Sequence, residues 1–475
     1  MPGYVSSSNT QTNQYRVGDH ISVTMVKGGG ITGKIIDAVG RSVAGSSVKA
    51  VRVRDEEGHK INESNYGEEV SDDRGVYRSY GLRNGTYLIK VSRTPSSIPN
   101  PRFNELPTYF PSVARDTAQE ITVKAGAEIT GIDVAYRGES GHIISGTIAN
   151  SGGIQPASRI TIQLRVLSTG TIIGSAFVNT YTKPGFAFYA VPDGEYEITA
   201  TQYQDTNSSN GINGIIGLAT PLNVTIRSSN VSGLILNFTK PGEITGRVTL
   251  EKMSGNNSAC QPTRNSLVEE ILVNSIIDTP GSRLGLRQRL APNNQGDFSV
   301  SAVSAGTYRF STQLPVDFWY LKAVTRAAKP AKIDVATTGI SVKAGDKISG
   351  LSLLVAEGAA SLQGKIMAEL NQKLPSRMRV HAIPTKTREA ENLLRYFEVI
   401  TRDSTFNFTN LPPGKYWLYV EKYPETETLE KSHYFVAWEA KLRVQLRQAA
   451  EAAKQLIELS PCQKVKDFGL MVKVR

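Results

Sequence analysis

The sequence predicts an all-β chain of four tandem antiparallel β-sandwich domains, because three short motifs recur four times in the same order along its 475 residues. The opening motif sets a glycine between apolar residues and recurs at Gly33, Gly146, Gly246 and Gly364. The middle motif is glycine, any residue, then tyrosine, and contains Tyr87, Tyr196, Tyr308 and Tyr416. The closing motif is a glycine followed by an apolar residue, at Gly131, Gly233, Gly350 and Gly469.

The copies have the size of whole domains. Successive opening glycines are 113, 100 and 118 residues apart, which exceeds the period of solenoid repeats and fits a small domain. Each copy is long enough to bury a core of its own. We therefore expect an N-terminal extension and four sandwiches, with boundaries at 1–28, 29–137, 138–240, 241–357 and 358–475.

The first copy shows the expected strands most clearly. Turn residues such as those of Asp72-Asp73-Arg74-Gly75 separate its apolar runs. The runs lie at 31–36, 47–53, 76–82, 86–91, 121–123 and 129–134. About seven short strands with turns at hairpin distances are typical of an immunoglobulin-like antiparallel sandwich. Because the tyrosine recurs in every copy, we expect its ring in each core, with the hydroxyl bonded to backbone.

One segment departs from the β pattern. Residues 436–459 combine helix-forming residues with apolar residues at helical spacing, and Pro461 follows them. The segment lies before the closing motif of the last copy. We therefore expect one α-helix inserted in the fourth domain and packed on its sandwich.

The titratable residues show no catalytic or metal-binding pattern. None of the five histidines has the spacing of a zinc peptidase, and no nucleophile elbow, phosphate loop or dinucleotide motif occurs. Ser140 and His142 are close in sequence but lack an orienting acid. The acidic groups at 55–57 and 72–73 read as solvated turns rather than calcium loops. We expect no enzyme activity, no metal and no cofactor.

Charge, hydropathy and cysteine content limit the classes of partner and the location of the protein. The net charge of +11 comes from dispersed basic residues without a run of five, so we do not expect a nucleic-acid partner. No apolar stretch is long enough to span a membrane, and the N-terminus lacks the pattern of a signal peptide. Cys260 and Cys462 either form a disulfide across the last two domains or remain two buried thiols.

Aromatic residues provide the candidate ligand site. Trp319 and Tyr320 in the third copy, and Trp417 in the fourth, are candidates for a face on which sugars stack. Strand alternation turns at least half of such residues into the core.

The N-terminal extension contains a segment similar to a closing strand. Ile21, Val23 and Met25 alternate with polar residues and lead into the opening motif, as residues 347–355 do before the fourth copy. An isolated strand cannot bury such a face. Three explanations remain: a truncated start, a strand added to the first sandwich, or a strand inserted into another subunit. The last would join subunits head to tail.

The motifs resemble those of the carboxypeptidase regulatory-like domain family. The resemblance is clearest at 30–33, 40–45, 73–77 and 82–87, and in a close variant at 406–416. It implies transthyretin-like (prealbumin-like) sandwiches from about residue 29 onward. The tandem arrangement of the copies is similar to that of some secreted bacterial proteins. It implies an extracellular or cell-surface location and carries over no catalytic residue.

Taken together, these observations predict a non-enzymatic extracellular structural or adhesive array. Its partners would be other copies of itself, other cell-surface proteins or polysaccharide. The alternative is a carbohydrate-binding accessory protein of the cell surface that uses Trp319, Tyr320 and Trp417.

Overall fold

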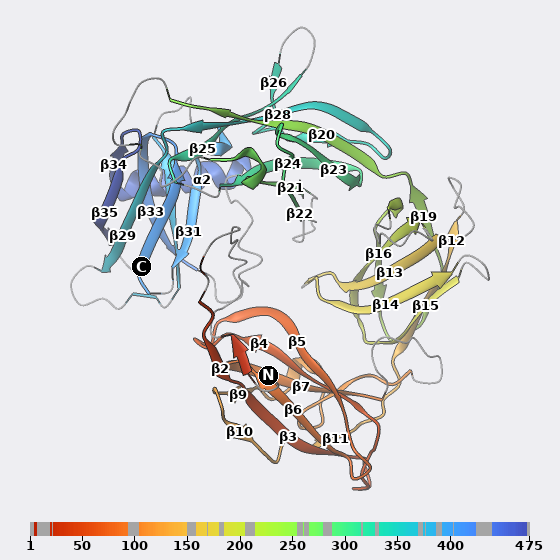
Figure 1. The fold of residues 1–475 in the computed structure, drawn as a ribbon. Coiled ribbons are helices and arrows are strands. Elements are labelled where there is room, and N and C mark those ends of the chain that lie inside the picture. Colours follow the sequence, from red (N-terminus) through yellow and green to blue (C-terminus); the bar gives the residue numbers. More distant parts are fainter. Residues whose placement is uncertain are drawn as a thin grey trace. The chain divides into compact units, whose positions relative to one another are not determined.

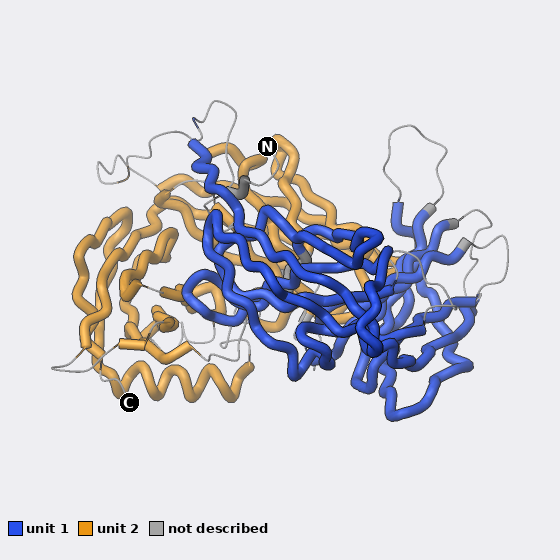
Figure 2. The backbone as a smooth tube through the Cα atoms, turned by 90° about the horizontal axis from the view of Figure 1, so that it is seen from below, with its two compact units in different colours: residues 1–240, 425–431 blue, residues 241–424, 432–475 orange. Residues whose placement is uncertain are grey.

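A computed structural model of the chain describes its four domains and part of the N-terminal extension. The described residues are 4–6, 20, 22–93, 104–149, 158–168, 170–179, 185–204, 214–253, 260, 266–278, 287–314, 317–327, 332–368, 374–375, 377–385, 392–401, 403–423 and 439–472. The chain divides between Lys240 and Pro241 into two compact units, shown in Figure 2. This division falls at the boundary expected between the second and third sandwiches.

The first domain contains two sheets around one core, with a short hairpin before it (Figure 1). The hairpin is β1 (Tyr4–Ser6) and β2 (Met25–Lys27). One sheet contains β3 (Gly29–Ile36), β6 (Val76–Leu82), β10 (Glu128–Ile129) and β11 (Val134–Ala135). The other contains β4 (Ser47–Arg54), β5 (Lys60–Val70), β7 (Gly85–Ser92), β8 (Thr108–Tyr109) and β9 (Ile121–Val123), and a 3-10 turn, η1 (Arg115–Thr117), follows β8.

The second domain repeats this arrangement and links its two sheets. β12 (His142–Ala149), β15 (Gly185–Val191) and β19 (Val231–Thr239) form one side. β13 (Ser158–Val166), β14 (Ile172–Asn179), β16 (Gly194–Gln204), β17 (Ile215–Ala219) and β18 (Leu222–Ile226) form the other. β17 also pairs with β19, which joins the sides.

The third domain has a five-stranded and a four-stranded sheet. The first contains β20 (Gly242–Glu251), β23 (Asp297–Val303), β25 (Trp319–Ala327), β26 (Lys332–Asp334) and β28 (Lys347–Glu357). The second contains β21 (Leu272–Asp278), β22 (Arg287–Leu290), β24 (Gly306–Gln313) and β27 (Ile340–Val342), with η2 (Val268–Glu270) before β21.

The fourth domain has a three-stranded and a four-stranded sheet. The first contains β29 (Ala360–Ala368), β32 (Thr405–Leu411) and β35 (Lys464–Val472). The second contains β30 (Met378–Pro384), β31 (Phe397–Thr401), β33 (Gly414–Lys422) and β34 (Leu456–Leu459), with η3 (Leu393–Arg395) before β31. These four sandwiches, each with its own buried cluster, confirm the predicted all-β fold class.

The predicted helix is shorter than its sequence pattern. α2 runs over Ala440–Ala453 and packs on the outer side of the β30–β33 sheet through Leu446 and Ala450. Lys454 has a φ of 54°, a left-handed conformation that ends the helix. Leu456–Leu459, which we predicted as its last turn, instead forms β34 and pairs with β33. The alternation of buried Ile457 and Leu459 shows that a period of two applies there.

Each domain joins its opening and closing strands in parallel, within an otherwise antiparallel pattern. The pairs are β3 with β10 and β11, β12 with β19, β20 with β28, and β29 with β35. In each pair the opening glycine lies against a carbonyl of the closing strand. A Cβ on Gly246, for example, would lie 2.7 Å from the Leu351 oxygen and 2.6 Å from Cζ of Phe298. The recurring glycine is therefore a requirement of close strand approach.

The closing motif was placed wrongly in the fourth copy. In the first three copies, Gly131, Gly233 and Gly350 have φ of 75–77° and precede the residue whose carbonyl meets the opening glycine. In the fourth copy Asp467, with φ of 56°, takes this place and Phe468 meets Gly364. Gly469 pairs with Lys365 instead. Aspartate tolerates the left-handed region, so a motif defined by glycine missed it.

A one-residue bulge recurs four residues before the middle glycine. The residues at this position have positive φ: Gly81 (68°), Ala190 (56°), Ala302 (57°) and Asn410 (60°). Between two paired positions, one residue on the opening strand faces two on the bulged strand, as Ile143 does between the pairs His142–Val191 and Ile144–Phe188. Because two of these residues are alanines, the surrounding fold must impose the conformation.

The four tyrosines occupy equivalent core positions, as predicted. Each hydroxyl donates a hydrogen bond to the carbonyl four residues earlier, at 2.7–3.1 Å; the acceptors are Arg83, Pro192, Ser304 and Pro412. Burial raises the pKa of Tyr196 to about 12, so the hydroxyl remains a donor at neutral pH. Each tyrosine thus ties its strand to the turn before it.

Gly146→Ala is expected to destabilise the chain by about 1–3 kcal/mol, because the new Cβ would overpack the site. It would lie 2.8 Å from Cβ of Leu234 and nearer still to the Leu234 carbonyl oxygen. Chemical denaturation followed by far-ultraviolet circular dichroism measures the change in the free energy of unfolding. Gly185→Ala is the control in the same domain, since its Cβ meets nothing closer than 3.7 Å. Equal effects of the two substitutions would contradict the close-approach explanation.

Candidate functional site

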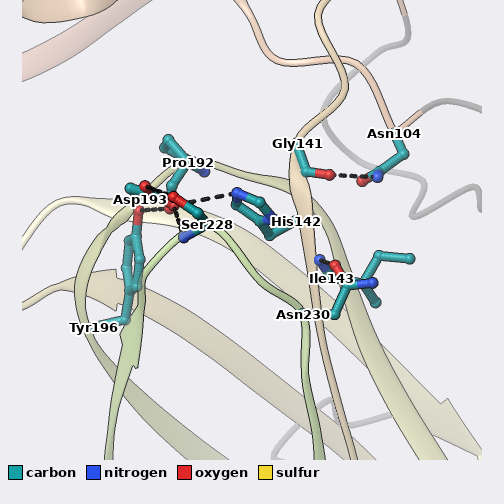
Figure 3. A network of polar contacts seen from close by, with 9 residues as sticks. All are labelled: Asn104, Gly141, His142, Ile143, Pro192, Asp193, Tyr196, Ser228 and Asn230. Atoms are coloured by element: carbon teal, nitrogen blue, oxygen red, sulfur yellow. Dashed lines mark hydrogen bonds and ion pairs between the residues drawn. The ribbon is translucent and has the colours of Figure 1, made fainter.

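The junction between the first and second domains is organised by one asparagine (Figure 3). Asn104 follows β7 in the first domain, and its Oδ1 accepts from the backbone N–H of Ala190, the bulge residue of the second domain, at 2.5 Å. Its Nδ2 donates to the Gly141 carbonyl at 2.6 Å, and its own carbonyl accepts from the Gly141 N–H at 2.6 Å. One residue therefore fixes both the connecting segment and the bulge of the next domain.

A histidine, an aspartate and a serine meet beside this junction without forming a catalytic triad (Figure 3). Nε2 of His142 lies 3.1 Å from Oδ1 of Asp193, and Oγ of Ser228 donates to Oδ2 of the same carboxylate at 3.2 Å. In a hydrolase triad the histidine lies between acid and serine, whereas here both bond to the acid. A hydrogen bond from the Ser228 N–H lowers the pKa of Asp193 and keeps it ionised. Ser140 takes no part and instead forms a backbone bridge with Glu105.

The junction between the third and fourth domains is built around Phe318 and closed covalently. The Phe318 carbonyl accepts from the N–H groups of Gly358 and Ala359 at 2.7 and 2.9 Å. Nζ of Lys464 lies 4.6 Å from the Phe318 ring centroid and 3.2 Å from Asp317, so cation–π and ionic contacts coincide. Cys260 and Cys462 form a disulfide, with their Cα atoms 5.1 Å apart.

The two junctions use the same pair of elements. In both, the segment that follows the tyrosine strand of the earlier domain meets the bulge of the later domain. Asn410, the bulge residue of the fourth domain, donates through Nδ2 to the Trp319 carbonyl at 2.7 Å. The asparagine belongs to the earlier domain in one junction and to the later domain in the other.

The N-terminal extension reaches the equivalent bulge of the first domain. A Cβ on Gly28 would lie 2.7 Å from Cα of Gly81, the bulge glycine. Just before it, Val23 and Met25 are 60% and 51% exposed, and Met25 begins β2. Ile21 lies outside the described residues. Val23 and Met25 therefore present an apolar face beside the position that a preceding domain holds elsewhere.

The aromatic residues considered for sugar stacking do not form a common surface. Trp319 is 3% exposed and lies in the third-domain core, and Tyr320 is half-buried on the same strand. Trp417 is partly buried and packs with the cluster formed by Leu446 and Ala450 of α2. The expectation of a stacking face is therefore wrong for Trp319, because a ring inside the core has no face for a ligand.

One group of described residues has the composition of a metal site. Asp55, Glu57 and His59, in the turn between β4 and β5, place one ligand atom each within 4.8 Å of one another. Asp55 is 2% exposed, so the prediction of a solvated turn is wrong for this residue, whereas Glu56 and Glu57 are exposed. Its Oδ1 accepts from the His59 N–H at 2.8 Å and lies 3.4 Å from Nδ1 of the ring. These contacts give the group a structural role in the turn.

A second polar group lies under the helix side of the fourth domain. His381 is 2% exposed, and its Nε2 lies 3.1 Å from Oε1 of Glu421, which Arg379 also contacts at 3.1 Å. Burial lowers the pKa of His381, so its ring is neutral at neutral pH. Burial opposes ionisation of Glu421, but the His381 hydrogen bond and the Arg379 charge outweigh it and lower its pKa. His381 and Arg379 are buried while Glu421 is partly exposed, and the contacts tie β30 to the neighbouring β33.

Sequence reasoning missed the residues that organise the junctions. Asn104 lies in a segment without apolar periodicity, and Asn410 entered the sequence analysis only as a member of the motif variant at 406–416. The sequence does contain a signal for the bulge: one position, four residues before each middle glycine, is shared by all four copies. It is occupied by Gly81, Ala190, Ala302 and Asn410. Their different side chains concealed a shared backbone conformation.

Comparison with known proteins gives distant structural likenesses. No family model matches the chain, and no curated protein matches it. The resemblance to carboxypeptidase regulatory-like domains therefore remains a prediction. Similar solved structures include the Bacillus anthracis TIE protein, at 14% identity and a TM-score of 0.16. The likeness covers 71% of this chain and 52% of that protein, so the chain spans about half its length.

Two further likenesses are to pilins. The minor pilin GBS52 of Streptococcus agalactiae is 11% identical, with a TM-score of 0.21, over 50% of this chain and 99% of that one. The major pilin BcpA of Bacillus cereus is 12% identical, with a TM-score of 0.14, over 70% and 100%. Similarity this low carries no argument, so the fold rests on the strand pairings above. Among the described residues, no helix is long and apolar enough to cross a membrane.

Asn104→Ala is expected to raise the hydrogen-exchange rates of the Ala190 and Gly141 amides about tenfold. The substitution removes both side-chain bonds, whose combined loss corresponds to about 1–2 kcal/mol of local opening. Mass-spectrometric hydrogen exchange on the full chain measures the rates. Amides of β13 serve as the internal reference, and unchanged protection at Ala190 would show that Asn104 does not hold the junction.

Lowering the pH from about 7.5 to about 5.5 is expected to lower the melting temperature of the chain, in part because His381 becomes protonated. Its folded pKa is lowered from 6.5, so its stabilising contribution is complete above pH 6.5 and is lost as the pH falls toward the folded pKa. His381→Gln, which retains a donor to Glu421, should reduce this dependence. His142→Gln, at a more exposed ion pair, is the comparison. Identical pH profiles of His381→Gln and the native chain would contradict the assignment.

Proposed function

We propose that this chain is a non-enzymatic structural or adhesive protein of the cell surface or extracellular space. The observation that carries the proposal is the construction of the domain junctions. The two junctions inside the compact units join an earlier domain to the bulge of the next by hydrogen bonds, and one adds a disulfide. Such junctions make each of the two pairs of sandwiches resist extension.

The polar clusters support a structural role. Asp193 bonds with both His142 and Ser228, while His381 is buried with Glu421. A catalytic group needs contact with substrate and a geometry that moves protons. In the part of the chain that the structure describes, these side chains instead stabilise turns and strands.

The disulfide supports an extracellular location. Disulfides persist in oxidising compartments and are rare in reducing ones. Cys260 and Cys462 are separated by 202 residues, so their bond constrains a long loop in the unfolded chain. Such a constraint stabilises the folded state, which suits a protein that is under mechanical load outside the cell.

The finer part of the proposal is head-to-tail assembly through the N-terminal segment. Val23 and Met25 are exposed beside the bulge of the first domain, the position that a preceding domain contacts at other junctions. A strand with an exposed apolar face gains by pairing with another sheet. The burial of Trp319 and the packing of Trp417 with α2 residues argue against the carbohydrate-binding alternative.

Assembly is tested by negative-stain electron microscopy and light scattering of the full chain. We expect particles linked end to end, and single particles for Met25→Asp, because a charge on the apolar face opposes its burial. Val39→Asp is the matched control, since Val39 is 73% exposed in the same domain. Single particles for the native chain at every concentration, or linked particles that persist in Met25→Asp, would overturn the assembly proposal.

A further inference from the structure

The second domain has an edge strand, β14, without charged residues. β14 is the end strand of its sheet and pairs with β13 on one side alone among the described strands. Its eight residues carry no charge, and Ile172, Ile173 and Phe177 are 44%, 38% and 62% exposed. Arg159 and Arg165, the nearest charges in the pairing, stand one strand inward. A long uncharged edge with exposed apolar residues favours pairing with another strand.

The other three domains provide an internal comparison. The strands equivalent to β14, each paired with the second strand of its domain, are β5, β22 and β31. All three carry charges, which discourage edge pairing: Lys60, Glu68 and Glu69 in β5, Arg287 and Arg289 in β22, and Glu398 in β31. The second domain is therefore the copy in which this edge lacks that protection.

The N-terminal segment has the matching chemistry. Residues 22–26 carry no charge, and Val23 and Met25 share one exposed apolar face. Among the described strands, β2 pairs with β1 alone, over three residues. A hairpin this short has little stability of its own. An uncharged segment fits an uncharged edge without burying an unpaired charge.

We propose that β14 is the acceptor edge for residues 22–26 of a second copy of this chain. The inference rests on the proposed head-to-tail assembly and names the surface that receives the strand. Val23 and Met25 turn inward beside Ala176 and Val178, the buried residues of β14. Ser22 and Thr24 then lie on the outer face beside Ser175 and Phe177, because side chains alternate along both strands.

The contact is tested by mixing two full-chain variants, Thr24→Cys and Ser175→Cys, with a short bismaleimide cross-linker. The native cysteines are joined to each other, so the new thiols are the reactive groups. We expect a cross-linked pair that contains one copy of each variant, identified by mass spectrometry. Cross-links between two Ser175→Cys copies alone would show that β14 pairs with itself and would overturn the assignment of the donor.

Charge placed on the edge tests the acceptor. Ser175→Lys with Phe177→Lys should weaken association at least about tenfold, as measured by light scattering, since lysine discourages edge pairing. Asn223→Lys with Thr225→Lys adds the same charge to exposed positions of β18, at the other side of that sheet, and should leave association unchanged. Assembly that depends on Met25 but survives the β14 charges would overturn the acceptor while retaining the proposed function. No assembly at all would overturn both.

Discussion

The fold of every domain depends on the close approach of its opening and closing strands. A glycine without a Cβ lets the closing strand place a carbonyl where a side chain would stand, and the parallel pair then brings the two ends of the domain together. This pairing fixes where the chain enters and leaves each sandwich. Since entry and exit strands are neighbours, the next domain begins beside the completed sheet, and the junction geometry follows from the pairing.

The bulge connects the interior of each domain to its neighbour. The residue with positive φ interrupts the ladder, so its backbone groups are directed away from regular pairing. At Ala190 the freed N–H donates to Oδ1 of Asn104 in the preceding domain, and at Asn410 the side-chain amide donates to the Trp319 carbonyl of the preceding domain. The same local irregularity thus permits different side-chain solutions, which explains why the junctions resemble each other in backbone and differ in residues.

The sequence predicted the all-β class, the number of sandwiches and the role of the tyrosines, because each depends on local motifs with a direct structural cause. It placed the fourth closing motif wrongly because Asp467 adopts a conformation that glycine adopts in the other copies. It extended the helix through Leu456–Leu459 because a short strand after a helix can satisfy helical spacing. The junction contacts of Asn104 and Phe318 were not predictable, since they join segments far apart in sequence through backbone groups.

The disulfide has a consequence for the order of biogenesis. Cys260 is made soon after the third domain begins, whereas Cys462 follows β34 of the fourth domain. During vectorial synthesis or export the first thiol must therefore wait while some two hundred residues emerge, and the bond can close only when the fourth sandwich has nearly formed. A chain arrested before that point would keep Cys260 as an unpaired thiol. The disulfide therefore forms only in chains in which both of the last two domains have been made.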